Sequence, residues 1–375
     1  MKRYARLEVI FMKTKESPQQ IASKLYLSIA LLKECNYKCA YCHPMGESKV
    51  TYGENLTQRE LEEVIDAAVR SGIKRYRFTG GECTLLAWFE EALVYALKRA
   101  PDVHVNICTN GSRLGRHLDL LEKYRDRVGI RVSLDSTNEN HRQAGLYKIL
   151  THNLKETLVE LSRRGIRTRF NTVITSINRK ELDALADLAI SLGFDLKLLD
   201  LYMQEEYIAT RDASGAHAQE DSNRAMEYWR ENYVDLNDLI PEVQRISDRK
   251  IDKYCEDGGF GIPMYAYETG GARIIFKDST RGSFFHREDC MNRCRYYGLT
   301  CQEGIYTPHV SSNMILHVNG CHNPALQKNL RSRSADEMLQ AFREFLSLFT
   351  NLQYVPTPPP PLSYHVNRVR KEAAC

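Results

Sequence analysis

The feature that most restricts the fold of this chain is an alternation of short apolar runs and amphipathic helical segments between residues 25 and 205. Six runs have the length and composition of strands: 25–31, 75–79, 103–109, 129–135, 167–174 and 194–202. Strand and helix repeated in this order predict a parallel sheet with right-handed crossovers and helices outside it. Pattern alone does not distinguish a barrel from an open sheet. In both, reactive groups lie on loops at the carboxyl ends of the strands.

Local signals predict where several helices begin. Thr57 and Glu60 stand at the spacing of a capping box, and Asn178 is a suitable helix cap. An apolar helix face is predicted to start at Ile149. Further along, one helix is predicted to be interrupted by Pro241.

Composition indicates an ordinary soluble globular protein, with 43% hydrophobic and 27% charged residues. The net charge of +4 is small against 52 basic and 48 acidic side chains, so no nucleic-acid polymer is expected as a partner. We find neither a signal peptide nor a run near the ~20 apolar residues of a membrane span, and expect a cytoplasmic protein with no membrane partner. Eleven cysteines then favour metal binding or catalysis over disulfides.

Three cysteines follow the first predicted strand: Cys35, Cys39 and Cys42 in "CNYKCAYC". Soft thiolates select zinc or iron–sulfur clusters, and structural zinc normally takes four protein ligands. His43 is adjacent to Cys42, and neighbouring side chains rarely close a tetrahedron. A cluster with one iron left open for a small ligand fits three thiols better.

This motif resembles the CxxxCxxC motif of the radical S-adenosylmethionine (SAM) superfamily, where an aromatic residue such as Tyr41 usually precedes the last cysteine. The resemblance implies that three thiolates hold a 4Fe–4S cluster and that SAM binds the fourth iron. One electron then cleaves SAM to a 5′-deoxyadenosyl radical, which takes a hydrogen atom from the substrate. The implied fold is a partial (β/α)6 TIM-like barrel with a small C-terminal cysteine-rich module.

Further motifs end the next predicted strands. In "FTGGEC", two glycines let the backbone approach a ligand and Glu82 can receive a cationic group; the resemblance assigns this stretch to the SAM amino group. The alternative is a strand-to-helix turn with a capping acid. "TNG" (109–111) and Ser133 also end strands, and turn chemistry is the alternative for both.

Within the superfamily, the segments between residues 25 and 325 are most similar to the GTP 3′,8-cyclase family. The resemblance implies SAM contacts at Tyr41, Gly80, Gly81, Glu82, Asn110, Ser133 and Met203, and substrate contacts at Arg77, Thr109 and Arg169. An arginine fork suits a phosphate or a carboxylate. The alternative for Arg77 is an exposed residue of the sheet ladder.

A second group of thiols lies near the C-terminus: Cys290, Cys294, Cys301 and Cys321. The cyclase family carries a second, auxiliary 4Fe–4S cluster on three cysteines there, with one iron open to the substrate. Four thiols allow full ligation, which would make the cluster an electron relay or a structural element. Three ligands with one free thiol, or a zinc site, are the alternatives. Cys255 and Cys375 stay unassigned, and Cys83 and Cys108 are predicted to be buried or strand-end residues.

Departures from the cyclase pattern argue against GTP itself. The basic segment after the auxiliary cysteines is replaced by "CQEGIYTPHV", and Tyr26 or Ser28 stands where an arginine is expected. We therefore predict a radical SAM enzyme acting on another small anionic nucleotide-, nucleoside- or sugar-like substrate, with flavodoxin or ferredoxin as electron donor. A peptide (RiPP) maturase with a SPASM or twitch cluster is the second hypothesis. A non-enzymatic iron–sulfur or zinc protein is the third.

The expected organisation has five parts. They are an N-terminal extension (1–24), the barrel core (25–205), a linker loop and helix (206–250), the auxiliary cluster module (251–330), and a C-terminal helix with a proline-rich tail (331–375).

Overall fold

A computed structural model describes residues 12–13, 17–42, 54–201, 227–254, 264–281, 285–294, 297–298, 301, 304–318, 321, 323–350 and 352–354. Four residues discussed above lie outside these ranges: His43, Met203, Cys255 and Cys375.

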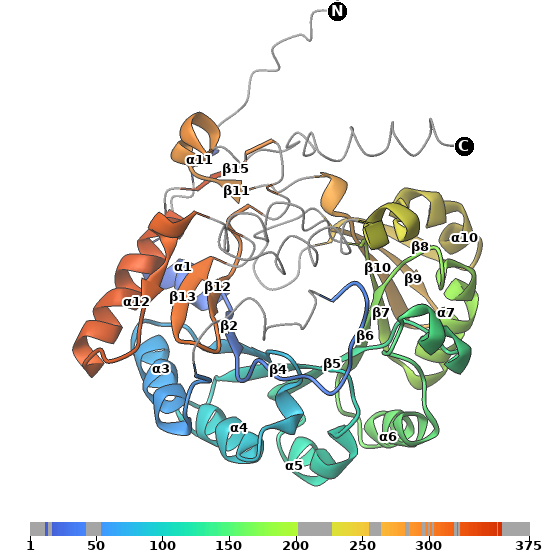
Figure 1. Cartoon of the computed structure of the whole chain (residues 1–375), viewed down its shortest axis with the longest axis horizontal. Coiled ribbons are helices and arrows are strands. Elements are labelled where there is room, and N and C mark those ends of the chain that lie inside the picture. The colour runs from blue at the N-terminus through green and yellow to red at the C-terminus, as the bar shows by residue number, and fades with distance from the viewer. Residues whose placement is uncertain are drawn as a thin grey trace, which may run out of the picture.

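Six consecutive strands form the centre of the main sheet. They are β2 (Leu27–Ala30), β3 (Arg75–Thr79), β4 (His104–Thr109), β5 (Val128–Ser133), β6 (Thr168–Val173) and β7 (Asp195–Leu199). Each strand pairs in parallel with the next, which confirms the six predicted strands and their order. The strands curve around a common interior with helices outside (Figure 1).

Strands from the C-terminal part of the chain extend this sheet at both edges. β12 (Pro308–Val310) pairs in parallel with β2, and β10 (Ala272–Lys277) pairs in parallel with β7. Antiparallel strands continue beyond them: β13 (Ile315–Val318) and β14 (Lys328–Asn329) on one side, β9 (Met264–Thr269) and β8 (Arg249–Tyr254) on the other. The two outermost strands, β14 and β8, do not pair with each other, so the twelve strands form a partial barrel.

A second, small sheet is antiparallel and contains β1 (Met12–Lys13), β15 (Gln353–Tyr354) and β11 (Phe285–His286). The described helices include α1 (Pro18–Lys24), α3 (Gln58–Arg70), α4 (Phe89–Lys98), α5 (Leu118–Lys123), α6 (His152–Arg163), α7 (Leu182–Leu192), α10 (Ile240–Arg245), α11 (Glu288–Arg293) and α12 (Ala335–Thr350). The α3 helix begins with the predicted capping box of Thr57 and Glu60. Along the outer side of the sheet, α12 contacts α1 and α3 (Figure 1). In the described part of the chain, no helix has the length and apolar character needed to span a membrane.

Two local predictions are wrong, and a third is right only in position. Ile149 lies before α6, whose cap is Thr151, and forms a β-bridge with Ser136 instead. Asn178 precedes the helical turn Arg179–Glu181 as predicted, but its buried side chain makes no capping hydrogen bond, because it is bonded to the backbone of Asp135 and Val173. Pro241 lies in the first turn of α10, where its missing N–H costs nothing.

The strands separate two kinds of side chain. On the outer face, Ile29, Phe78, Ile107 and Ile130 stand side by side in register and are buried in the core that the helices cover. Because side chains alternate along a strand, the residues between them face the barrel interior. These inward residues are largely polar: Ser28, Arg77 and Asn106 in one row, with Arg131, Arg169 and Lys197 on β5, β6 and β7. A polar interior is suited to bind a polar ligand.

Candidate active site

The loop that carries Cys35, Cys39 and Cys42 leaves the carboxyl end of β2 and is bonded to the loop after β3. Three backbone hydrogen bonds of 2.8 to 2.9 Å continue the pairing of the two strands into these loops. They run from the N–H of Leu31 to Thr79, from Gly81 to Leu32, and from Glu82 to Glu34. The thiols are therefore held against the GGE segment.

The two glycines permit this close approach. A Cβ atom on Gly81 would lie 2.1 Å from the carbonyl oxygen of Glu34, and one on Gly80 would lie 2.3 Å from that of Leu32. Gly80 also has a φ of +130°, which other residues rarely adopt. The backbone that these glycines accommodate in the structure is the cysteine loop itself. Direct contact of the glycines with SAM stays a prediction.

Glu82 is 1% exposed and joins the β3 and β4 loops. Its Oε1 accepts hydrogen bonds from Thr84 N–H at 3.0 Å, Thr84 Oγ1 at 2.5 Å and Thr109 Oγ1 at 2.6 Å; Oε2 accepts one from Asn110 N–H at 2.5 Å. Glu82 thus caps the short helix Cys83–Leu85, as the alternative interpretation expected. These four bonds match the roughly four acceptor sites of a carboxylate, and a contact of Glu82 with the SAM amino group stays a prediction.

Replacing Glu82 by glutamine is expected to destabilise the fold by about 1–3 kcal/mol, because the new amide would point N–H groups at buried donors. The measurement is the free energy of unfolding in denaturant. Glu139→Gln, at an exposed position, is the matched control and should leave that free energy within about 0.5 kcal/mol. Equal stability of the two variants would contradict this role of Glu82.

Asn110 connects the β4 loop to the cysteine loop. Its side-chain N–H groups donate to Asn36 Oδ1 at 2.9 Å and to Cys35 Sγ at 3.8 Å, and its Oδ1 accepts from Ser112 N–H at 2.9 Å. The structure therefore brings Glu82, Asn110 and Cys35 together. The predicted SAM contact of Asn110 is not tested by these bonds.

Tyr41 contacts a carboxylate and an ammonium group on the segment after β5. Its hydroxyl donates to the carboxylate of Asp135, which also accepts a hydrogen bond from Val173 N–H at 2.9 Å. The Nζ atom of Lys148 lies 5.0 Å from the centre of the Tyr41 ring. Burial lowers the pKa of Lys148, but the negative charges of Asp135 and the three thiols outweigh this effect and raise it above its ordinary value. Lys148 is therefore a positive charge beside the cysteine loop.

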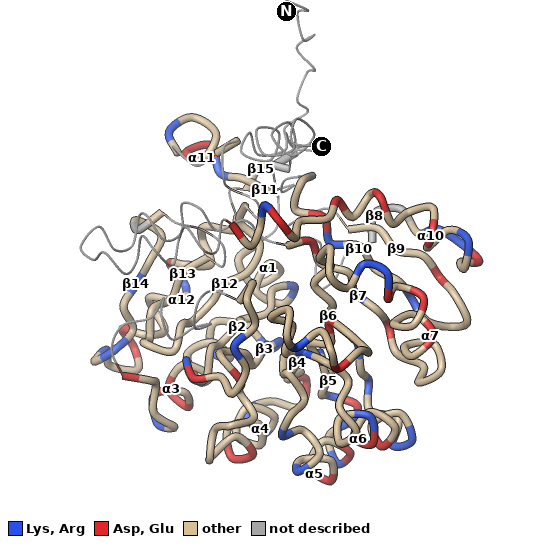
Figure 2. Tube along the Cα trace, turned by 45° about the vertical axis from the view of Figure 1, so that its right-hand side comes forward, with Lys and Arg blue, Asp and Glu red and all other residues tan. Residues whose placement is uncertain are grey.

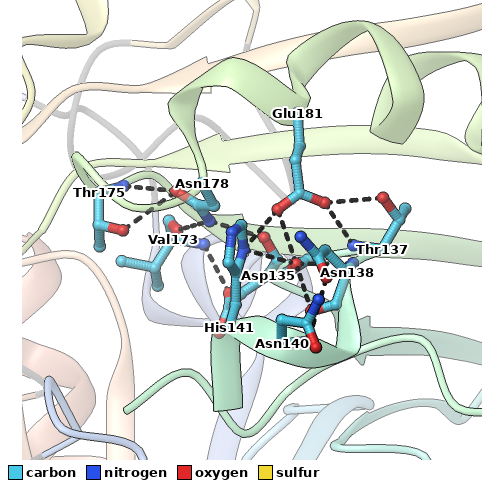
Figure 3. A network of polar contacts seen from close by, with 10 residues as sticks. Asp135, Thr137, Asn138, Asn140, His141, Val173, Thr175, Asn178 and Glu181 are labelled. Carbon is cyan, nitrogen blue, oxygen red and sulfur yellow. Dashed lines mark hydrogen bonds and ion pairs between the residues drawn. The ribbon is translucent and has the colours of Figure 1, made fainter. Parts of the chain in front are cut away.

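A hydrogen-bond network fixes the backbone on both sides of Asp135 (Figure 3). Glu181 accepts hydrogen bonds from Ser136 Oγ at 2.7 Å and from the Thr137 N–H and Oγ1 at 2.8 and 2.7 Å. Asn178 Nδ2 donates to the carbonyl oxygen of Asp135 at 2.6 Å. The Asp135 carboxylate is thereby oriented toward the cysteine loop.

The three N-terminal thiols are suited to an iron–sulfur cluster. They lie on one loop, half-buried or buried, and burial raises the pKa values of Cys35 and Cys39 while the charge of Lys148 lowers them. Metal ligation requires thiolates, so a nearby cation favours it. Among the described residues, no three His, Cys, Asp or Glu side chains are arranged to hold a single metal ion.

The four C-terminal thiols lie close enough to influence one another. Burial raises the pKa values of Cys290, Cys301 and Cys321, the last two to about 12 and about 11. The charge of Cys294 raises all three further, and Cys290 raises those of Cys301 and Cys321. The four thiols thus lie within electrostatic range of one another, and their ligation of one cluster stays a prediction. Cys83 and Cys108 are separate from both groups: Cys83 is buried, and its thiol contacts the Cys108 carbonyl at 3.2 Å.

Basic side chains converge in the barrel interior. Burial lowers the pKa of Lys197 well below its ordinary value, and the charges of Arg169, Lys277, Arg131 and Arg77 lower it further. The outer surface differs, because Lys and Arg intermingle there with Asp and Glu along α5 and α6 (Figure 2). Ion pairs such as Arg164–Asp119, at 2.7 Å, join those helices. An anion would therefore be attracted to the interior more than to the outer helices.

Tyr26 stands beside two of the interior arginines. Its hydroxyl accepts a hydrogen bond from Arg77, and its ring centre lies 4.1 Å from the Arg77 guanidinium carbon and 5.9 Å from that of Arg131. Arg169 donates to Asn171 Oδ1 at 3.1 Å. Tyr26 thus orients Arg77 within the interior.

Sequence reasoning does not identify Asp135, Lys148, Arg131, Lys197 or Lys277 as site residues. The alternation of basic and apolar residues in "RYRFT", "RTRF" and "LKLL" is a signal that could have found part of the basic interior. Lys148 lies between strands and carries no such signal.

Comparisons with known proteins agree with this arrangement. Residues 29–189 match the Radical SAM superfamily. The GTP 3′,8-cyclase of Synechocystis sp. is 29% identical over 176 residues, which are 47% of this chain and 53% of that protein, so the chain spans about half the length of this relative. The subtilosin biosynthesis protein AlbA of Bacillus subtilis is 26% identical over 281 residues, covering 73% of this chain and 60% of that protein.

Among solved structures, Streptococcus suis SuiB bound to S-adenosylmethionine has a similar fold. The TM-score is 0.53 at 15% identity, and the match covers 85% of this chain and 65% of that chain. The sequence match and the partial barrel together identify residues 29–189 as a region of the radical SAM superfamily.

Proposed function

We propose that this radical SAM enzyme acts on a small anionic nucleotide-, nucleoside- or sugar-like molecule bound in the barrel interior. The observation that carries the proposal is the group of five basic side chains at Lys197, Arg77, Arg131, Arg169 and Lys277. Phosphates and carboxylates are the ligands that arginine forks bind best.

Cys35, Cys39 and Cys42 would hold the 4Fe–4S cluster, and the loops after β3, β4 and β5 would receive SAM. When bound, the cluster and SAM supply a 5′-deoxyadenosyl radical that takes a hydrogen atom from the substrate. The chain itself keeps the thiols in place through the glycine contacts and the Tyr41–Asp135 bond. Arg77 and Arg169 would orient the anionic part of the substrate. The electron would come from a flavodoxin- or ferredoxin-type donor.

The second thiol group would hold an auxiliary 4Fe–4S cluster. The mutual influence of the four thiols supports ligation by Cys290, Cys294, Cys301 and Cys321 together. No iron would then be open to the substrate. The cluster would pass electrons or stabilise the module around α11.

Anion binding is expected to be coupled to proton uptake by Lys197. An anion beside this amine stabilises its charged form and raises the pKa that the basic neighbours depress. At pH values between the pKa of Lys197 in the free protein and its higher pKa in the complex, binding of the anion takes up a proton. The affinity therefore falls as the pH rises. Calorimetric titration with pyrophosphate in two buffers of different ionisation enthalpy measures the uptake. Lys197→Met should abolish it and Lys155→Met, on the exposed side of α6, should not; equal heats with the parent protein in both buffers would contradict the coupling.

Formation of 5′-deoxyadenosine tests the function. Protein loaded with iron and sulfide is reduced, mixed with SAM and supplied with nucleotides, sugar nucleotides or peptides. We expect a nucleotide or sugar nucleotide to stimulate product formation and to transfer deuterium into it. Arg169→Met should raise the KM of that substrate about 10- to 100-fold, the loss expected for a charged hydrogen bond of about 1.5–3 kcal/mol, whereas Arg163→Met on α6 should not. Absence of 5′-deoxyadenosine under all conditions would overturn the proposal.

A second candidate is a peptide-modifying enzyme. It is supported by the similarity to AlbA, a bacteriocin biosynthesis protein, which covers 73% of this chain. Stimulation by a precursor peptide and by no nucleotide or sugar would select this candidate.

A further inference from the structure

The segment Gly145–Lys148, between η3 (Glu139–Ala144) and α6, lies against the cysteine loop. The N–H of Ala40 donates to the carbonyl oxygen of Gly145 at 3.0 Å. Gly145 has a φ of +85°, and a Cβ atom there would lie 2.7 Å from the Cβ of Ala40. The rings of Tyr37 and Tyr147 are in contact, with centres 6.4 Å apart. The cysteine loop therefore packs against a second segment, Gly145–Lys148, in addition to the GGE segment.

Backbone hydrogen bonds hold Lys148 in place within this segment. Its carbonyl oxygen accepts hydrogen bonds from the N–H groups of Asp135 at 2.7 Å and Ser136 at 3.3 Å. Its ammonium group lies at the Tyr41 ring, and Tyr41 directly precedes Cys42. The carboxylate of Asp135 is bonded to the hydroxyl of the same tyrosine. The position of this charge is thus set by the same bonds that orient the loop.

We propose that the positive charge of Lys148 makes the N-terminal cluster easier to reduce. The inference rests on the proposed function, which assigns a cluster to Cys35, Cys39 and Cys42. One electron from the external donor adds one negative charge at this site and breaks no bond. A cation held in a partly buried position stabilises the added charge, because the local dielectric is lower than that of water. The negative charges of the three thiolates and Asp135 disfavour the added electron, and the positive charge of Lys148 offsets part of this effect.

Redox titration of the loaded full-length protein tests this role. The N-terminal cluster is identified by the EPR signal that changes when SAM is added. The quantity measured is the midpoint potential of this cluster. Lys148→Met should lower the equilibrium constant for reduction at least about tenfold, which is about 59 mV for a one-electron couple. Lys148→Arg keeps the charge and should restore the parent potential. Lys155→Met removes one positive charge from exposed α6 and should leave the potential unchanged.

The outcomes separate this inference from the proposed function. A parent protein that forms 5′-deoxyadenosine, together with a Lys148→Met variant of unchanged potential, overturns the role of Lys148 alone. A parent protein that forms no 5′-deoxyadenosine overturns the proposed function. If Lys148→Met takes up no iron, Lys148→Gln is titrated instead, and the same shift or its absence decides the question.

Discussion

Cys39→Ala is expected to abolish the formation of 5′-deoxyadenosine and to remove about half of the iron bound by the loaded protein, since each thiol group would hold one 4Fe–4S cluster. Cys39 is the most buried of the three N-terminal thiols, at 6% exposure, and its carbonyl accepts the hydrogen bond from Cys42 N–H at 3.1 Å. Water cannot easily replace this ligand at a buried position. Iron content and chromatographic detection of 5′-deoxyadenosine measure the two effects.

Cys83→Ala is the matched control for this variant. Cys83 is fully buried but belongs to neither thiol group, so its loss removes packing and no ligand. We expect a loss of about 1 kcal/mol in unfolding free energy with iron content and product formation retained. Full activity in Cys39→Ala, or equal iron loss in both variants, would contradict the ligand assignment.

Gly81→Ala is expected to prevent iron uptake at the N-terminal site. The added methyl group would lie 2.1 Å from the carbonyl oxygen of Glu34 and 2.6 Å from that of Lys33. Both atoms belong to the backbone, so the cysteine loop itself must move, and the hydrogen bonds that join the loops after β2 and β3 are lost. Overpacking of this kind costs typically about 1–3 kcal/mol in unfolding free energy. Iron content and thermal unfolding measure the loss of cluster and of stability.

Gly165→Ala separates this clash from the general effect of an added methyl group. Gly165 has a φ of +64°, and a Cβ atom there meets nothing within 4 Å. Only backbone strain of about 1–2 kcal/mol is expected, with normal iron uptake. Normal iron uptake in Gly81→Ala would show that the cysteine loop does not depend on the close contact.

The central part of the fold could be predicted from the sequence because its signals are local. The six strands and the capping box of α3 each depend on residues close together in the chain. The parallel additions β10 and β12 were not foreseen, since their partners β7 and β2 are distant in sequence. Pairing of that kind depends on contacts between segments far apart in the chain, which local sequence signals do not encode.

The candidate site was predictable to a smaller extent. The two thiol groups could be named from spacing and from the family resemblance, and their ligation of clusters stays a prediction. The part that sequence could not provide depends on three-dimensional neighbours. Lys148 and Asp135, which both lie between β5 and α6, contact Tyr41 of the distant cysteine loop. The GGE segment is a further example, because its glycines accommodate the cysteine loop in the structure.

The central claim is that one iron of the N-terminal cluster is open and binds SAM. The most direct test is the EPR spectrum of the anaerobically loaded and reduced protein before and after addition of SAM, in a variant with alanine at Cys290, Cys294, Cys301 and Cys321. We predict that SAM changes the spectrum of the remaining cluster and that this change is lost when Cys35, Cys39 and Cys42 are also replaced. An unchanged spectrum on addition of SAM would contradict the claim.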